Sequence, residues 1–229
     1  MKNNLKILIT GADGFIGSHL TEALVEAGYD VRAFVYYNSF NSNGWLDTVP
    51  KEIKNKIEFF SGDIRDPNGV REAMKEVDIV FHLAALIAIP FSYHSPDSYI
   101  DTNVKGTLNI LQAARDNKVK RILVTSTSEV YGDPTVSPQP ESYRGFVNSY
   151  GPRSCYDEGK RVAEALCYDF KNKLNKDIRL VRIFNTYGPN MAINDGRVVS
   201  NFITQALKNE PLTVYGRGEQ TRSLCYVSD

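Results

Sequence analysis

The sequence contains few residues of the kinds that bind metal ions or form disulfides. Among its 229 residues there are only three cysteines and three histidines. Cys155, Cys167 and Cys225 are odd in number and do not have the spacing of a metal site. We therefore expect reduced thiols, as in a cytosolic protein, and no metal centre.

The sequence also lacks an excess of charge of either sign and lacks a long apolar run. Acidic and basic residues number 27 each, so nothing indicates a nucleic-acid partner or an anionic membrane surface. The longest apolar runs, such as residues 78–89 (DIVFHLAALIAI), are too short to span a bilayer, and no signal-peptide pattern opens the sequence. We expect a globular cytoplasmic protein with no membrane partner and no nucleic-acid partner.

What the sequence does contain is an alternation of short apolar runs with longer amphipathic stretches. The predicted strands are residues 5–10, 30–36, 57–61, 78–83, 119–125 and 178–184. The predicted helices are residues 15–28, 67–76, 96–117 and 154–174, with a shorter helix at 197–209. Several strands are apolar almost throughout, as is typical of strands covered by helices on both faces. This order predicts an α/β fold with a doubly wound parallel sheet.

Two long polar loops and one change of pattern complete the predicted organisation. Residues 37–50 and 132–153 form loops of a length that usually serves a binding site or a partner. After residue 185 the alternation stops. We therefore predict a nucleotide-binding domain over residues 1–185 and a small, incomplete substrate-binding lobe over residues 186–229.

Three glycines follow the first predicted strand in the segment ITGADGFIGSHL. Gly11, Gly14 and Gly17 have the spacing G-x-x-G-x-x-G at the turn into the first predicted helix. Glycine there permits a tight turn and lets backbone N–H groups approach a pyrophosphate at the helix N-terminus. A purely structural turn is the alternative, but its place after the first strand favours a Rossmann-like dinucleotide site. Phe15 and Ile16 belong to the same predicted site.

The end of the second predicted strand bears on the choice of cofactor. It reads FVYYNSF, without the Asp or Glu that usually binds the ribose 2′-hydroxyl of NAD. We expect NAD, and for this reason NADP stays open. Arg32 could favour a 2′-phosphate, but its place within the strand makes a surface role the stronger interpretation.

Further candidate positions lie at the carboxyl ends of the other strands and on two predicted helices, where one ligand could contact all of them. For Asp63, a carboxylate that caps a turn or a helix is the alternative. The additional predicted cofactor-binding residues are Asp63, Ile64, Leu83, Ala84, Ala85, Asn103, Thr125, Tyr156 and Lys160.

Hydroxyl groups and a carboxylate gather after the fifth predicted strand, in the segment VTSTSEVYG. Thr127, Ser128 and Glu129 could bind and protonate a substrate at this edge of the sheet. A strand end that caps its own turn would have a similar composition. The segment therefore predicts a catalytic site only in combination with other signals.

Tyr156 and Lys160 form the strongest candidate catalytic pair. Residues four apart lie on one face of a helix, so the ammonium can approach the phenol. Ionising a free tyrosine at pH 7 costs about 4 kcal/mol, and an adjacent cation lowers a pKa by about 1–3 units. Together with a positive nicotinamide ring, Lys160 is expected to make Tyr156 a working base. Two side chains on an exposed helix face are the alternative.

Taken together, the glycine turn, TSTSEVYG, the Tyr-x-x-x-Lys pair and RIFNTYGP resemble the extended short-chain dehydrogenases/reductases, the NAD-dependent epimerase/dehydratase family, that act on nucleotide sugars. The resemblance implies core catalytic roles for Thr127, Tyr156 and Lys160. Ser128 and Glu129 would then be adapted to the particular reaction. The implied substrate-binding residues are Asn185, Arg197, Val198, Tyr215 and Arg222, with Asn185 and Arg222 at the diphosphate.

The two halves of the chain resemble different branches of this family. From SEVYGDP to PLTVYGRGEQTRSLCYV the sequence resembles UDP-glucuronate decarboxylases, whereas FVYYNSFNSNGWLD and SPDSYIDTNVKGTLNILQAAR resemble UDP-N-acetylhexosamine 4,6-dehydratases. Because the C-terminal half contains the active-site helix, the resemblance implies NAD-dependent decarboxylation of UDP-glucuronate to UDP-xylose through a 4-keto intermediate. The alternatives are a UDP-sugar 4,6-dehydratase or 4-epimerase, and a dinucleotide-binding module without turnover.

The resemblance also implies a homodimer and a chain that is C-terminally truncated. Members of the family continue beyond Asp229, and the decarboxylases use an arginine from that part. We therefore expect either a fragment of a longer protein or a shortened form with reduced or no turnover. Helices 96–117 and 154–174 would pair in a four-helix dimer interface. Their apolar residues could equally be core against the sheet.

Overall fold

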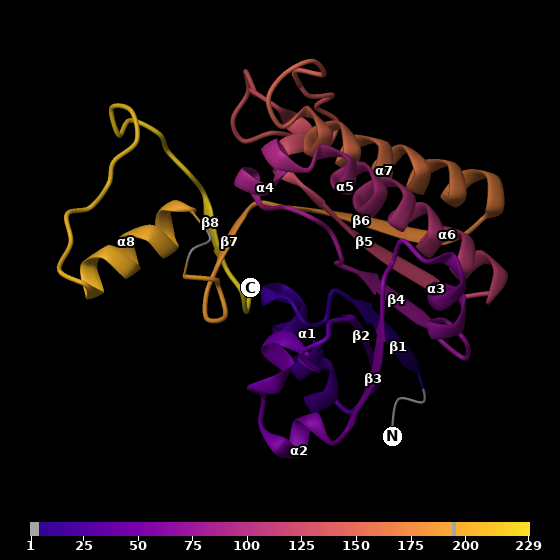
Figure 1. The fold of residues 1–229 in the computed structure, drawn as a ribbon. Helices are drawn as coiled ribbons and strands as arrows, with labels where there is room; N and C mark the ends of the chain where they lie inside the picture. The colour runs from indigo at the N-terminus through magenta and orange to yellow at the C-terminus, as the bar shows by residue number, and fades with distance from the viewer. Residues whose placement is uncertain (1–4, 194–195) are drawn as a thin grey trace. The chain divides into compact units, whose positions relative to one another are not determined.

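The computed structural model describes residues 5–193 and 196–229, and a six-stranded parallel sheet dominates it (Figure 1). The strands are β1 (Lys6–Thr10), β2 (Asp30–Tyr36), β3 (Ile57–Gly62), β4 (Ile79–His82), β5 (Arg121–Thr127) and β6 (Asp177–Ile183). Their order is β3-β2-β1-β4-β5-β6, and every neighbouring pair is parallel. This doubly wound topology confirms the predicted fold class.

The helices follow the predicted pattern with some additions. They are α1 (Phe15–Glu26), η1 (Gly44–Asp47), α2 (Lys51–Lys54), α3 (Pro67–Ala73), α4 (Ile89–His94), α5 (Pro96–Tyr99), η2 (Ile100–Gly106), α6 (Thr107–Asp116), η3 (Ser128–Tyr131) and α7 (Ser154–Leu174). The predicted helix 96–117 consists of α5, the π-helical η2 and α6 in succession. Helix α4 was not predicted, because its residues continue the apolar run of the fourth strand.

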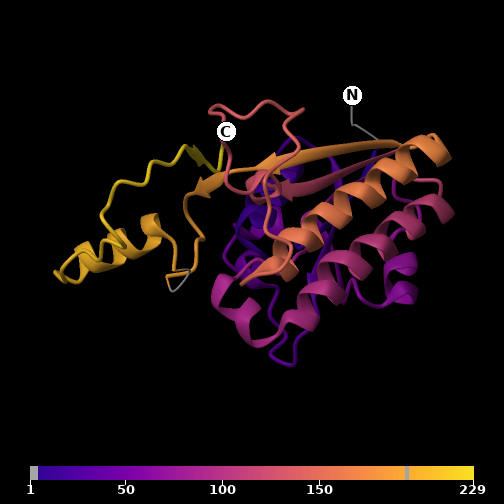
Figure 2. The same cartoon turned by 90° about the horizontal axis from the view of Figure 1, so that it is seen from above.

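The sheet carries one hydrophobic core on each face. Strand β1 shows why, since alternate side chains of a strand point to opposite faces. Leu8 belongs to the core formed with α3, α6 and α7, while Ile7 and Ile9 belong to the core formed with α1, η1 and α2. Figures 1 and 2 show α6 and α7 side by side along the same face. Two covered faces explain why the strands are apolar almost throughout.

The predicted surface role of Arg32 is wrong. Its residue is 7% exposed, and its guanidinium donates to the Ala73 and Lys75 carbonyls at 2.7 and 2.9 Å. It also forms an ion pair of 2.7 Å with Glu58. Because β2 is an interior strand, this side chain reaches the end of α3 and satisfies its last carbonyl groups.

The chain divides into two compact units, one up to Ile183 and one from Phe184 to Asp229. The second unit contains β7 (Asn185–Tyr187), α8 (Val198–Leu207) and β8 (Leu224–Tyr226), and β7 pairs with β8 in parallel. Helix α8 agrees with the short helix predicted at 197–209, whereas neither short strand was predicted. Within the described residues, no helix has the length and apolar character that a membrane crossing requires.

Candidate active site

The carboxyl ends of β1, β4 and β5 lie at one edge of the sheet, because these neighbouring strands are parallel. In open α/β sheets this edge is where ligands bind. The glycine turn follows β1, the predicted segment Leu83–Ala85 follows β4, and η3 follows β5. The topology therefore brings three of the predicted site segments to a common edge.

The glycine turn after β1 is closely packed on its own backbone. Gly11 has a φ of +69°, and a Cβ there would lie 2.8 Å from the Ala84 backbone nitrogen. A Cβ at Gly17 would lie 2.0 Å from the Gly11 carbonyl oxygen, so only glycine fits. Gly14 then precedes α1, whose first turn begins with Phe15 and contains no acidic residue. A helix N-terminus whose backbone N–H groups are not covered by side chains of the preceding turn is suited to binding a pyrophosphate.

A chain of hydrogen bonds anchors the segment that follows β4. Thr107 donates its hydroxyl proton to the Asn103 carbonyl, so its oxygen must accept from His82 Nε2, 3.1 Å away. His82 Nδ1 is then the acceptor for the Thr10 hydroxyl at 2.7 Å, and the Thr10 oxygen accepts from the Ala84 N–H. The hydrogen-bond pattern thus assigns the Nε2–H tautomer to His82.

Asn103 is a predicted cofactor-binding residue, and its side-chain amide forms hydrogen bonds with the protein backbone. Its Oδ1 accepts from the Leu86 N–H and its Nδ2 donates to the Leu86 carbonyl, both at 2.9 Å. The side chain is buried in η2. It holds the backbone beyond Ala84 and Ala85 in place, which is a structural contribution to that edge of the sheet.

The predicted pair after β3 also has protein partners. Asp63 accepts two hydrogen bonds from the Arg65 guanidinium, at 2.9 Å from Nε and 2.5 Å from Nη2, and this pairing lowers the pKa of Asp63. Ile64 is buried in the core, where its side chain packs against Gly106. Asp63 also accepts from the Arg65 N–H at 2.9 Å, as a turn carboxylate does, and its role in cofactor binding stays a prediction.

A carboxylate does lie beside the end of β2, but it comes from the glycine turn. Asp13 Oδ2 accepts from the Tyr36 N–H at 3.2 Å, and burial raises the pKa of Asp13. The Trp45 N–H donates to the Asp13 carbonyl at 3.1 Å, which attaches the 37–50 loop to the turn. The sequence analysis missed Asp13, because no rule of motif spacing brings it to the end of β2.

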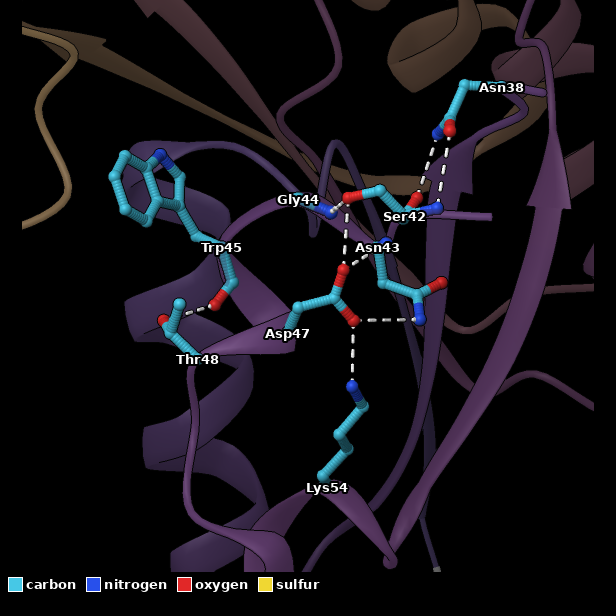
Figure 3. Close-up of polar contacts among 8 residues, drawn as sticks. All are labelled: Asn38, Ser42, Asn43, Gly44, Trp45, Asp47, Thr48 and Lys54. Carbon is cyan, nitrogen blue, oxygen red and sulfur yellow. Dashed lines mark hydrogen bonds and ion pairs between the residues drawn. The ribbon is translucent and has the colours of Figure 1, made fainter. Parts of the chain in front are cut away.

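The 37–50 loop is held by its own polar side chains (Figure 3). Asn38 donates to the Ser42 carbonyl at 2.8 Å and accepts from the Ser42 N–H at 3.2 Å. Asp47 accepts from the Asn43 N–H at 2.8 Å and pairs with Lys54 at 2.7 Å. The Lys54 hydrogen bond is the main cause that lowers the pKa of Asp47 to about 2.

At the end of β5, Thr127 begins η3 and faces the predicted tyrosine. Its Oγ1 accepts from the Glu129 N–H at 3.3 Å, and its side chain also hydrogen-bonds Tyr156. Thr127 and Tyr156 are each 8% exposed, whereas Ser128 and Glu129 are only partly buried. The structure therefore brings together the predicted residues of β5, η3 and α7.

Lys160 lies one turn beyond Tyr156 on α7, but its ammonium is hydrogen-bonded elsewhere. Its Nζ donates to the Thr125 carbonyl at 3.1 Å, and burial lowers the pKa of Lys160 to about 8. The pKa of Tyr156 is raised, chiefly by burial, with the Thr127 hydrogen bond acting in the opposite direction. The expected activation of Tyr156 by Lys160 together with a nicotinamide ring stays a prediction.

Two charged residues that the sequence analysis missed surround this tyrosine. Arg153 Nη2 lies 3.0 Å from Glu129 Oε2 and 3.1 Å from Asp157 Oδ1. Its guanidinium carbon is 5.5 Å from the centre of the Tyr156 ring. The i, i+4 spacing of Arg153 and Asp157 was a visible signal, whereas the contact with Glu129 depends on the fold.

The predicted substrate-binding residues all belong to the unit that begins at Phe184. Asn185 lies in β7 and donates to the Ser223 carbonyl at 3.1 Å. Arg197 precedes α8, Val198 is its first residue, and Tyr215 and Arg222 are exposed. Their role in binding a sugar nucleotide stays a prediction.

Comparison with known proteins adds independent support. The model of the NAD dependent epimerase/dehydratase family matches residues 7–229. UDP-glucuronic acid decarboxylase 5 of Arabidopsis thaliana is 51% identical over 229 residues, covering 100% of this chain and 64% of the relative. UDP-glucuronic acid decarboxylase 1 of Xenopus tropicalis is 47% identical over 231 residues, covering 100% of this chain and 52% of the relative. The chain thus spans about half to two thirds of the length of these relatives.

Solved structures of nucleotide-sugar enzymes also superimpose on this chain, at lower sequence identity. The UDP-N-acetylglucosamine 4-epimerase of Methanobrevibacter ruminantium M1 superimposes with a TM-score of 0.87 at 30% identity, over 99% of this chain and 70% of that one. The UDP-glucuronic acid 4-epimerase of Bacillus cereus, in complex with UDP-glucuronic acid and NAD, gives 0.84 at 28% identity, over 98% and 70%. The resemblance inferred from the motifs is confirmed: the chain belongs to the NAD dependent epimerase/dehydratase family.

Proposed function

We propose that this chain carries the cofactor site and proton-transfer site of an NAD-dependent enzyme that converts UDP-glucuronate to UDP-xylose through a 4-keto intermediate. The observation that carries the proposal is the group formed by Thr127, Glu129 and Tyr156 at the edge of the sheet that also bears the glycine turn. The 51% identity to a UDP-glucuronic acid decarboxylase over the whole chain supports this choice of reaction.

The residues present fit a dinucleotide. The close approach of Gly17 to the Gly11 carbonyl forms the tight turn before α1, and the first turn of α1, which has no acidic residue, provides a favourable field for a pyrophosphate. NAD held there would supply reversible hydride transfer at C4 of the sugar. We assign NAD as the cofactor, and the carboxylate of Asp13 beside Tyr36 supports this choice.

The chain's own residues would move the protons. Tyr156 Oη takes the proton of the C4 hydroxyl as the hydride leaves C4, and the Thr127 hydrogen bond favours the ionised phenol. The resulting 4-keto sugar is a β-keto acid, so its C5 carboxylate leaves as carbon dioxide and C5 gains a proton. Glu129 and Ser128 assist at this stage. Tyr156 would return its proton to the C4 oxygen as the carbonyl is reduced again, which would yield UDP-xylose.

The experiment supplies the chain with NAD and UDP-glucuronate and follows carbon dioxide release and sugar products by NMR. We expect carbon dioxide and UDP-xylose, and a fall of about 10²–10⁴-fold in rate for Tyr156→Phe. Binding of NAD without carbon dioxide or a 4-keto product would contradict the decarboxylase proposal, and the further absence of any converted sugar would favour a dinucleotide-binding module without turnover.

A 4-epimerase or a 4,6-dehydratase is the second candidate function. Its support is structural, since a UDP-glucuronic acid 4-epimerase and a dTDP-glucose 4,6-dehydratase superimpose with TM-scores of 0.84 and 0.85. The same NMR experiment separates the reactions. An epimerase retains the C5 carboxylate and inverts C4, whereas a dehydratase loses water from a sugar with a 6-hydroxyl.

We further propose a cytoplasmic homodimer that pairs through α6 and α7. Val162 and Tyr168 on α7 are 41% and 69% exposed, which is unusual for apolar side chains on an amphipathic helix. Sedimentation of the wild-type chain beside Tyr168→Glu tests the proposal. A monomer at every concentration in both would contradict it.

A further inference from the structure

The backbone of Arg153 is in a conformation that residues other than glycine rarely adopt. Its φ is +68° and its ψ is 0°, in the left-handed region, directly before the first residue of α7. Such a conformation costs about 1–2 kcal/mol for a residue with a Cβ. Its carbonyl accepts from the Tyr156 N–H at 2.8 Å and from the Asp157 N–H at 3.3 Å. The strained residue therefore starts the helix that carries Tyr156.

The side chain of Arg153 links that helix to η3. One guanidinium nitrogen, Nη2, lies between the carboxylates of Glu129 and Asp157, at 3.0 and 3.1 Å. The side chain is only 19% exposed, and that of Asp157 only 20%, so solvent screens these charges less than on an open surface. The same guanidinium packs against the Tyr156 ring.

The groups around the Tyr156 phenol come from four elements. Glu129 is in η3, Asp157 is in α7, Thr127 ends β5, and Tyr99 of α5 packs edge-on against the Tyr156 ring at 6.2 Å. Glu129 and Asp157 both raise the pKa of Tyr156, and after the Thr127 hydrogen bond Arg153 is the cation that lowers it. Without Arg153, the carboxylates of Glu129 and Asp157 would oppose ionisation of the phenol and the guanidinium charge that offsets them would be lost.

We propose that Arg153 is a positioning residue, which fixes the Glu129 carboxylate beside Tyr156 and balances the two carboxylates that oppose loss of the phenol proton. The inference rests on the proposed function for its catalytic meaning. Its physical content, a balance of charge at Tyr156, belongs to the folded chain and is measurable without turnover. A guanidinium suits the role because one rigid group can hold two carboxylates and also lie against a ring.

The test measures the titration of Tyr156 by NMR in the chain labelled with ¹³C at the tyrosine ring carbon that bears the hydroxyl, with Tyr156→Phe identifying the signal. For Arg153→Gln we expect the Tyr156 pKa to rise by about one unit or more. In Arg153→Lys the Tyr156 pKa should rise less, because lysine keeps the positive charge although it lacks the planar guanidinium. Arg161→Gln is the matched control, since Arg161 lies on the same helix and donates to the Val130 carbonyl; it should leave the titration unchanged.

A second variant keeps the experiment decisive if Arg153→Gln does not fold. Asp157→Asn removes one of the opposing carboxylates and keeps Arg153, so it should lower the Tyr156 pKa. Equal Tyr156 titration in the wild type, in Arg153→Gln and in Asp157→Asn would overturn the proposal. Where Arg153→Gln does not fold, an unchanged pKa in both Arg153→Lys and Asp157→Asn overturns it.

Turnover supplies the link to the proposed function. If UDP-glucuronate is converted, the ascending limb of the kcat profile should move to higher pH in Arg153→Gln, with a small change in KM. A merely structural role would lower kcat at all pH values alike. If the wild type shows no turnover, the proposed function fails, while the NMR titration still decides the inference about Arg153.

Discussion

At the scale of single residues, His82 connects β1, β4 and the start of α6 by hydrogen bonds in which each donor and acceptor has a defined role. A neutral imidazole is required, because Nδ1 must accept from Thr10 while Nε2 donates to Thr107. Burial, and then the charge of Lys160, lower the pKa of His82 to about 3. This histidine therefore makes stability depend on pH.

The direction of that dependence follows from proton binding. The unfolded chain protonates this histidine near its ordinary pKa of about 6.5, whereas the folded chain does not until about pH 3, so stability falls as the pH is lowered through this window. We expect a loss of about 2 kcal/mol from His82 between pH 7 and pH 5. Urea unfolding of His82→Gln should show a weaker pH dependence than the wild type, although its stability at pH 7 is lower.

His94→Gln is the control for this experiment, because His94 is exposed on α4. Its stability should follow the wild-type pH dependence. If His82→Gln lost as much stability between pH 7 and pH 5 as the wild type, the pKa of His82 would not be lowered in the folded state.

Two glycines give opposite predictions for the same substitution. Gly17→Ala places a Cβ 2.0 Å from the Gly11 carbonyl oxygen, so we expect a loss of about 3 kcal/mol in unfolding free energy and a large loss of NAD affinity. Gly159 lies inside α7, where a Cβ would meet atoms of Asn103 and Val104 at an ordinary 3.8 Å. Gly159→Ala should raise stability by about 0.5–1 kcal/mol through helix propensity. Urea unfolding and NAD titration of both variants measure the difference, and equal effects would contradict the close approach at Gly17.

At the scale of secondary-structure elements, a polar network joins β5, α7 and β6. Glu164 of α7 accepts from Ser126 of β5 at 2.6 Å and pairs with Arg182 of β6 at 2.8 Å. Arg182 also donates to the Tyr131 hydroxyl at 2.9 Å and lies over that ring. The network sets the position of α7 relative to the strand that ends at Thr127.

We therefore expect Glu164→Gln to cost about 2 kcal/mol, because hydrogen bonds to charged groups in partly buried sites contribute more than exposed ion pairs. Asp169→Asn is the control on the same helix, since its pair with Lys173 has side chains 54% and 73% exposed. Its expected effect is below about 0.5 kcal/mol. Urea denaturation measures both, and equal losses would show that the network does not contribute beyond an ordinary surface pair.

At the scale of the whole molecule, the two compact units differ in how much core they contain. Every buried hydrophobic residue among the described ones lies at or before Ile178, in the unit that ends at Ile183. In the described residues of the second unit, Ser200 alone is buried. Burial of apolar side chains supplies most of the free energy of folding, so the first unit should carry most of the chain's stability.

A fragment of residues 1–183 tests this prediction. We expect it to unfold cooperatively, with a midpoint temperature within a few degrees of that of the whole chain, and to bind NAD. Calorimetry of the fragment beside the whole chain measures the transition. A fragment without a cooperative transition would show that residues 184–229 are required for the core of the sheet to form.

The sequence by itself determined the order and nature of the main elements. Apolar periodicity depends on local residue spacing, so it predicts the six strands and α7, and the spacing of three glycines predicts the turn after the first strand. The same local spacing predicted that Tyr156 and Lys160 share a helix face. It missed β7 and β8, because strands of three residues carry too little periodicity to be recognised.

Only the tertiary structure decided how the predicted residues interact. Arg153 meets Glu129 across 24 residues of sequence, and Asp13 reaches the end of β2 across 23, since these contacts depend on the parallel sheet that brings both ends to one edge. The pKa of Tyr156 likewise depends on burial and on charges from η3 and α7. Local spacing fixes which face a side chain occupies, whereas long-range packing sets the dielectric surroundings and the charged neighbours that control its chemistry.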